Sequence, residues 1–251
     1  MKPHPRRDKR LSAAAALAAV AGPVWAQAPP MVAVPPIRPI SKTCAPAELV
    51  SMVVRDISPG VAAADARAQP RAIWRQGAKY FRNDEAPDLS RRGAAGSVIV
   101  SEPDIWTFNQ SSRQGQHGVD PGPNLEVHAP ILPVSPDLPA AFRTLEFGCE
   151  SGFITAFAPR LIGDAPWGPI SASAYGLTVG DQSVAILMDP ERRTPLLISY
   201  SRQGRVVFAL RYDAYQSGLA DRPELFQPPK DVVFSRGAAP QGAVSQPTPK
   251  R

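Results

Sequence analysis

The stretch VIVSEPDIWTFN, residues 98–109, decides the predicted fold because it has the pattern of two short strands joined by a tight turn. The run 98–100 is β-branched, and the run 106–108 combines aromatic residues with threonine, as strands prefer. Glu102-Pro103-Asp104 between the two runs is typical of a chain reversal. The stretch therefore predicts an antiparallel hairpin.

The same pattern continues on both sides of this hairpin, and Gln203-Gly204 predicts a second one. None of the β-rich runs is followed by a helical pattern of roughly 10 to 15 residues, which argues against a doubly wound parallel sheet. We therefore expect an α+β fold with a curved antiparallel sheet, an open half-barrel whose concave face carries few short helices. The predicted strands lie at residues 71–82, 96–101, 104–110, 125–128, 142–148, 152–158, 183–189, 195–201 and 205–213.

One amphipathic helix is predicted before the strands, at residues 46–57. Pro46 suits a first helical turn, and Leu49, Val53 and Ile57 follow one another at helical spacing. Ser58-Pro59-Gly60 ends the pattern. The Ala-rich residues 61–70 allow a short second helix.

The first 26 residues have the composition of a secretory leader. Five basic residues precede an apolar run from Leu11 to Val20, about half of the roughly 20 residues that span a bilayer. Val24 and Ala26 supply the small residues that precede a cleavage site, so we expect cleavage near Ala26 and a periplasmic mature chain. The expected division is a signal peptide at 1–26, a Pro-rich linker at 27–45, one folded domain at 46–235 and a disordered tail at 236–251.

The leader also accounts for most of the positive charge. The whole chain has a formal net charge of +6, and the leader holds five Lys or Arg against Asp8, a net +4, which leaves +2. The remaining arginines are scattered singly or in pairs such as Arg91-Arg92, without the basic stripes that a phosphate backbone requires. We expect no nucleic-acid partner.

Cys44 and Cys149 are the two cysteines of the chain. An exported protein with two cysteines commonly joins them in a disulfide, and this pairing is the favoured interpretation. Two buried thiols are the alternative. A metal site is disfavoured because no CxxC spacing is present.

Three stretches resemble the LolA-like periplasmic lipoprotein carriers. They are the hairpin at residues 98–109, the segment ELFQPPKDV at 224–232, and GRVVF at 204–208 with Arg211 and Tyr212. The resemblance covers about residues 46–235 and implies a half-barrel whose concave face binds lipoprotein acyl chains or lipid without catalysis. It also implies that the helix at 46–57 forms part of a lid through Leu49 and Val53.

Strand aromatics are the side chains expected to line an apolar groove on this sheet, because acyl chains need apolar contact and no directional polar partner. Ordinary core packing is the alternative for each of them. The expected lining residues are Trp74, Tyr80, Trp106, Phe108, Phe147 and Phe157. No cofactor is expected, and the expected partners are a lipid or lipidated protein and further proteins of the cell envelope.

Two other functions stay open. An interaction or scaffold protein of the cell envelope would fill the half-barrel with its own side chains. A metal-dependent hydrolase would rest on His117, Asp120 and His128, although their spacing matches no established ligand pattern. Neither a nucleophile elbow nor a glycine-rich phosphate loop occurs, and residues 113–123 suggest a surface loop that a partner protein could contact.

Overall fold

A computed structural model describes residues 44–88, 93–123 and 125–236, which form twelve strands, two α-helices and short 3-10 turns. The helices are α1 (Ala140–Arg143) and α2 (Glu150–Phe157), and the 3-10 turns include η1 (Ala66–Ala68) and η3 (Pro223–Phe226). The strands are β1 (Leu49–Asp56), β2 (Arg71–Gln76), β3 (Tyr80–Glu85), β4 (Gly96–Ser101), β5 (Asp104–Asn109), β6 (Gln114–Val119), β7 (Arg160–Trp167), β8 (Ile170–Val179), β9 (Gln182–Asp189), β10 (Thr194–Arg202), β11 (Arg205–Leu219) and β12 (Val233–Arg236).

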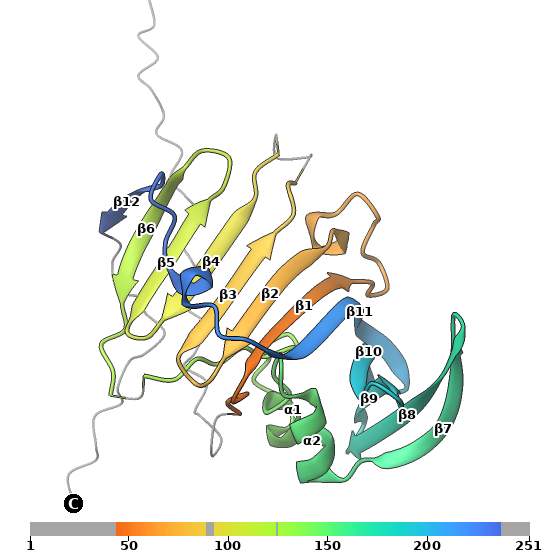
Figure 1. The fold of residues 1–251 in the computed structure, drawn as a ribbon. Coiled ribbons are helices and arrows are strands. Elements are labelled where there is room, and N and C mark those ends of the chain that lie inside the picture. Colours follow the sequence, from red (N-terminus) through yellow and green to blue (C-terminus); the bar gives the residue numbers. More distant parts are fainter. Residues whose placement is uncertain (1–43, 89–92, 124, 237–251) are drawn as a thin grey trace, which may run out of the picture. The chain divides into compact units, whose positions relative to one another are not determined.

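All twelve strands belong to one sheet, in the order β12-β6-β5-β4-β3-β2-β1-β11-β10-β9-β8-β7. Neighbouring strands are antiparallel except β12 and β6, which are parallel. The end strands β12 and β7 do not pair with each other, so the curved sheet stays open. The predicted fold class, an open antiparallel half-barrel with few helices, is confirmed (Figure 1).

The sheet carries a hydrophobic core on each side. On the helix side, Phe142 of α1 and Phe153 of α2 pack against apolar side chains of β1, β2 and β9–β11. On the opposite side, which we call the cover side, the C-terminal segment packs over β2–β6 through Phe226 and Val232. Figure 1 shows this segment, in blue, leaving β11, crossing the sheet and ending beside β6.

The helix predicted at 46–57 is wrong, because residues 49–56 form the central strand β1, paired with β2 and β11. Leu49, Val50, Val53 and Val54 fit a helical stripe as well as a strand. The alternating burial of Val50, Met52 and Val54 follows the period of two instead. β-Branched residues favour a strand, and pairing on both edges decides between the two patterns.

The hairpins at Glu102-Pro103-Asp104 and Gln203-Gly204 are confirmed as the turns between β4 and β5 and between β10 and β11. The strand expected at 71–82 is two strands, β2 and β3, which reverse at Gly77. The strand at 183–189 matches β9. Within residues 61–70 the helical structure is limited to η1.

Three predicted strands are wrong. Residues 125–128 form no strand, 142–148 span the end of α1 and a loop, and 152–158 lie mainly in α2. Four strands were not predicted: β6, β7, β8 and β12. Gly115 and Gly118 in β6, and Gly163 and Pro166 in β7, hide the strand pattern because both residue types are rare in strands. The loop expected at 113–123 is largely β6.

Neither helix of the described ranges is long and apolar enough to cross a membrane. The predicted leader at 1–26, nearly all of the linker at 27–45 and the tail beyond Arg236 lie outside the described residues.

Candidate functional site

Three of the six predicted lining aromatics lie together on the cover side of the sheet. Trp74 of β2, Trp106 of β5 and Phe108 of β5 pack in one cluster with the buried side chain of Ile99 from β4. The rows of the sheet explain this, since Ile99 is the register partner of Trp106. Tyr80, at the start of β3, is linked to them by the ring of Phe226 from the C-terminal segment. We call these four aromatic residues the aromatic cluster.

Two basic side chains lie at the aromatic cluster. The guanidinium carbon of Arg82 lies 5.6 Å from the centroid of the Trp74 ring. The His117 ring stacks on Trp106 with 5.2 Å between centroids, and its Nε2 lies 2.7 Å from Oδ1 of Asp104.

The cover segment, residues 221–236, closes over this cluster. Phe226 is 2% exposed and its ring lies 5.3 Å from that of Tyr80, while the Phe234 ring meets the edge of Phe108 at 5.9 Å. Arg82 donates a hydrogen bond of 3.0 Å to the carbonyl of Leu225. At its end the segment pairs with the edge strand β6 as β12. The apolar surface of the sheet is therefore filled by the chain's own side chains.

Gly115 of β6 makes room for the end of the cover segment. A Cβ at this position would lie 2.5 Å from the carbonyl oxygen of Thr107, 2.6 Å from Cβ of Phe108 and 2.9 Å from the Phe234 ring. A glycine is required here because backbone and two aromatic side chains meet over it.

The other two predicted lining residues lie away from the aromatic cluster. Phe147 is buried in the core on the helix side, with the guanidinium of Arg71 5.5 Å from its ring. Phe157 ends α2, is 36% exposed and packs on Phe153 at 4.8 Å. Leu49 and Val53, expected on a helix, lie in β1, where Leu49 is fully buried against the cover-side core.

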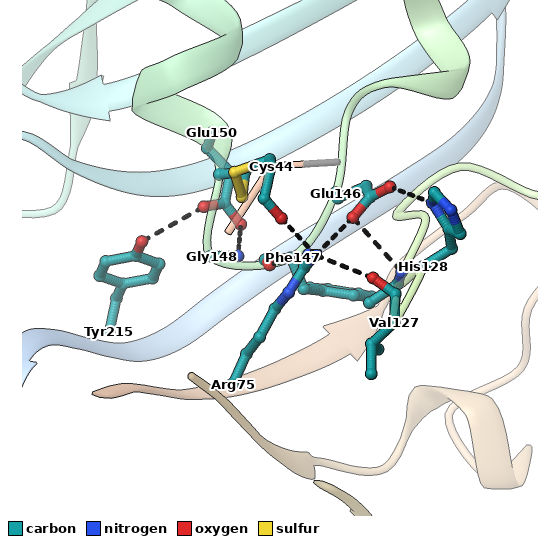
Figure 2. The surroundings of a disulfide bond; sticks show 11 residues. Cys44, Arg75, Val127, His128, Glu146, Phe147, Gly148, Glu150 and Tyr215 are labelled. Atoms are coloured by element: carbon teal, nitrogen blue, oxygen red, sulfur yellow. Dashed lines mark hydrogen bonds and ion pairs between the residues drawn. A yellow bond between two sulfur atoms is a disulfide. The ribbon is translucent and has the colours of Figure 1, made fainter. Parts of the chain in front are cut away.

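A second feature is a polar junction beside the disulfide of Cys44 and Cys149 (Figure 2). The two cysteines have a Cα–Cα distance of 6.0 Å and a sequence separation of 105 residues. The bond joins the chain just before β1 to the residue that precedes α2. The favoured disulfide interpretation of the sequence agrees with this structure.

Arg75 of β2 is fully buried at this junction. Its guanidinium donates to the carbonyls of Phe147 (2.9 Å), Cys44 (2.6 Å) and Val127 (3.1 Å), as Figure 2 shows. The same group forms an ion pair of 2.7 Å with Glu146. One side chain thus links β2, the N-terminal segment and the loop between β6 and α2.

Glu146 is also hydrogen-bonded to the imidazole of His128, whose Nδ1 lies 3.1 Å from Oε1 of Glu146. This hydrogen bond raises the pKa of His128. Burial alone would raise the pKa of Glu146, but the hydrogen bond from His128 and the charge of Arg75 outweigh it and lower that pKa. Both shifts favour the charged forms of His128 and Glu146.

Glu150, the first residue of α2, is a second buried carboxyl group. Tyr212 donates to it at 2.6 Å and Tyr215 at 3.3 Å, both from β11, and the backbone N–H of Gly148 donates at 3.2 Å. Burial raises the pKa of Glu150 despite these hydrogen bonds, and it raises the pKa values of both tyrosines as well. These contacts fasten α2 to the sheet.

His117, Asp120 and His128 do not gather into one site. His117 faces Asp104, Asp120 accepts a hydrogen bond from the N–H of Gly122, and His128 faces Glu146. No group of three or more His, Cys, Asp or Glu side chains within the described ranges is arranged to hold a metal ion. These residues therefore have structural partners of their own.

Sequence reasoning did not identify the covering role of Phe226 and Phe234, nor the buried Arg75. The Phe-x-Pro-Pro motif at 226–229 is the available signal for the cover, since it lies in one of the three stretches that carry the family resemblance. Arg75 gives no signal, because a single arginine in a strand is ordinarily exposed.

No family model matches the chain, and no curated protein matches it either. Among solved structures, the chain is similar to an uncharacterized conserved protein from Thermus thermophilus, with 13% identity over 76% of this chain and 91% of that one, at a TM-score of 0.44. It is also similar to MucB in complex with MucA(peri), with 11% identity over 74% and 57% of the two chains and a TM-score of 0.31. The LolA superfamily protein NE2245 from Nitrosomonas europaea shares 14% identity over 73% and 90%, at a TM-score of 0.29.

Proposed function

We propose that this chain is an exported, non-catalytic binding protein that holds a hydrophobic ligand, an acyl chain of a lipid or of a lipidated protein, against the aromatic cluster. The observation that carries the proposal is the way this cluster is covered. A single segment at the end of the described chain, rather than a second sheet, lies over the aromatic rings. Moving that segment exposes an apolar surface without opening the rest of the fold.

The chemistry of the cluster suits an acyl chain. Trp74, Trp106 and Phe108 offer broad apolar surfaces, and each buried CH₂ group of a ligand contributes roughly 0.8 kcal/mol. Phe226 occupies the position that we assign to the ligand, next to Tyr80. A ligand that displaces Phe226 exchanges one apolar contact for another, so binding and release stay reversible.

Export is supported by the disulfide, because disulfides form and persist in oxidising compartments such as the periplasm. It agrees with the leader composition of residues 1–26. Donor and acceptor proteins of the cell envelope are the partners we propose. Leu161 and Ile162, 54% and 63% exposed on edge strand β7, offer such a partner apolar contacts.

A scaffold protein with a self-filled core is the second candidate function. Phe226 and Val232 of the cover segment are 2% and 8% exposed, which is the burial expected of a permanent core. The two candidates differ in whether the cover segment leaves the aromatic cluster.

The test is uptake of a fluorescent C16 fatty acid by the mature protein, followed by energy transfer from tryptophan. Phe226→Ala removes the occupant of the proposed site and is expected to tighten uptake by roughly tenfold, whereas Trp106→Ala is expected to weaken it by a similar factor. Val179→Ala, at an exposed hairpin end of β8, is the matched control and leaves uptake unchanged. Equal uptake by all four proteins, or uptake by none of them, contradicts the proposal and favours the scaffold.

A further inference from the structure

A hollow of about 350 Å³ lies on the helix side of β3–β6, behind the aromatic cluster. Its lining residues come from all four strands: Asn83, Glu85, Gly96, Ser97, Val98, Thr107, Phe108, Asn109, Gln114, Gly115 and Gln116. The helices α1 and α2 pack on β1, β2 and β9–β11 and contribute nothing to this lining. The hollow shares Phe108 and Gly115 with the cover-side site, and its other lining residues are not part of that site.

The side chains of the hollow form two rows across the strands. Asn83 pairs with Val98, Val98 with Thr107, and Thr107 with Gln116. In the second row Gly96 pairs with Asn109 and Asn109 with Gln114. Successive residues of a strand point to opposite faces, so both rows face away from Ile99 and Trp106 on the cover side.

Glu85 lies over Gly96 in the second row. A Cβ at Gly96 would lie 2.7 Å from Oε2 of Glu85, so the absence of a side chain allows the carboxylate to lie close to the backbone of β4. Glu85 is the carboxylate of the hollow, and none of the described residues that line it is a lysine or an arginine. The described lining therefore carries a net negative charge, which disfavours an anionic ligand.

The residue types in these rows are unusual for strands. Asn83, Gly96 and Asn109 are of types that are depleted in strands, and they occupy adjacent strands. A sheet face that meets only water is ordinarily built from better strand formers and charged residues. Residue types that disfavour the local secondary structure are expected where a functional site requires them.

Asn83 supplies a further observation. Its Oδ1 is buried and accepts no hydrogen bond from any described residue. Buried polar atoms are nearly always paired, and those that are not require an explanation. A ligand hydroxyl beside Asn83 provides the missing donor.

We infer that this hollow binds an uncharged saccharide. Four side-chain amides, those of Asn83, Asn109, Gln114 and Gln116, both donate and accept hydrogen bonds, as the hydroxyl groups of a sugar do. Val98 lies among them and contacts the C–H groups of a sugar ring. This inference is independent of lipid binding, since the two sites lie on opposite sides of the sheet.

The test is titration of the ¹⁵N-labelled mature protein with maltotriose and with N,N′,N″-triacetylchitotriose, read on the side-chain NH₂ signals in two-dimensional spectra. We expect saturable shifts of the Gln114, Gln116 and Asn109 signals with at least one of the two neutral probes at up to about 10 mM, a range that covers weak binding. Trigalacturonic acid, which is anionic, is expected to bind at least roughly tenfold more weakly.

Variants connect the shifts to the hollow. Gly96→Val displaces the Glu85 carboxylate into the hollow and is expected to abolish the shifts, whereas Gln216→Ala, an exposed strand glutamine outside the hollow, leaves them unchanged. If Gly96→Val does not fold, Gln116→Ala is used in its place, and we expect this variant to bind at least roughly fivefold more weakly. Absence of shifts with both neutral probes, tighter binding of the anionic probe, or unchanged binding by these hollow variants overturns the inference.

Discussion

Arg75 shows how much a single side chain can hold together. Its buried guanidinium donates to three carbonyls, one in the segment before β1 and two between β6 and α2, and pairs with the carboxylate of Glu146. Removing one partner of a buried ion pair leaves the other as an uncompensated charge. The loops around the disulfide therefore depend on this residue for their position.

We predict that Arg75→Met lowers the free energy of unfolding by about 3–5 kcal/mol, the cost typical of a broken buried ion pair. Urea denaturation followed by tryptophan fluorescence measures it. Arg55→Met, which breaks the ion pair with Asp213 at a partly exposed site, is the control and costs less than about 1 kcal/mol. An equal loss of unfolding free energy in the two variants would show that the buried ion pair of Arg75 stabilises the fold no more than an exposed one.

Glu150 predicts a pH dependence whose sign follows from its raised pKa. The folded state retains the proton of Glu150 at pH values where the unfolded chain, with an ordinary value of 4.5, has lost it. Its contribution to stability is therefore greatest below 4.5 and declines as the pH rises toward the folded pKa.

Glu150→Gln removes this titration and keeps the hydrogen bond from Tyr212. We predict that the variant gains stability relative to the wild type between pH 4 and pH 7, measured as the difference in urea midpoints. All other titrating groups are shared, so their effects cancel in the difference. A difference in urea midpoint between the variant and the wild type that shrinks or stays constant over this range contradicts a raised pKa of Glu150 in the folded state.

At the residue scale, the sequence identifies aromatic residues on strands but does not show which face of the sheet each one occupies. Trp74, Trp106 and Phe108 were expected to line an apolar groove, and the structure places them in one cluster on the cover side. Phe147 and Phe157 were assigned to strands that the structure replaces with a loop and with α2, so the strand pattern could not predict where their side chains lie. Burial of Arg75 depends on carbonyls that lie 31 to 72 residues away in sequence, which no local pattern reports.

At the scale of elements, β1 shows why period alone does not separate a strand from a helix. The run 49–57 has apolar residues at enough positions to satisfy both periods, and the decision comes from the neighbouring strands β2 and β11. By contrast, the strands β4, β5, β9 and β10 were predictable because turn residues bound each of them. Gly115 of β6 has no room for a side chain and Gly163 of β7 has a positive φ, so both positions favour glycine, which weakens the strand pattern in the sequence.

Gly115 tests how tightly the cover element is fitted. We predict that Gly115→Ala costs about 1–3 kcal/mol, because the new Cβ meets the Thr107 carbonyl and Phe108 at less than contact distance. The matched control is Gly152→Ala in α2, where nothing lies within 4 Å of the new Cβ and helix propensity favours alanine by up to about 1 kcal/mol. Thermal unfolding of both variants gives the comparison, and a stabilising Gly115→Ala would contradict the packing described.

At the scale of the whole molecule, the disulfide joins the segment before β1 to α2 across 105 residues of chain. We predict that the double variant Cys44→Ser, Cys149→Ser unfolds at lower urea concentration, with a loss of about 2–5 kcal/mol, because a long loop is no longer closed in the unfolded chain. Reduction of the wild type with dithiothreitol gives a similar loss. Variant and wild type of equal stability under non-reducing conditions would show that the bridge contributes nothing.

The open sheet was predictable as a class because hairpin signals recur along the chain, but its covering could not be derived in the same way. The cover segment meets the aromatic cluster only when β2–β6, which are separate in sequence from that segment, are in register, and Phe226 gives no indication of its target in sequence. The central claim of the account is that this cover yields to a hydrophobic ligand.

Native mass spectrometry of the mature protein purified from periplasm tests that claim most directly, with organic extraction and identification of any bound lipid. The account predicts a stoichiometric acyl lipid or lipopeptide whose occupancy falls in Trp106→Ala. A protein that carries no lipid and takes up none when it is added would contradict the claim and leave a self-filled scaffold.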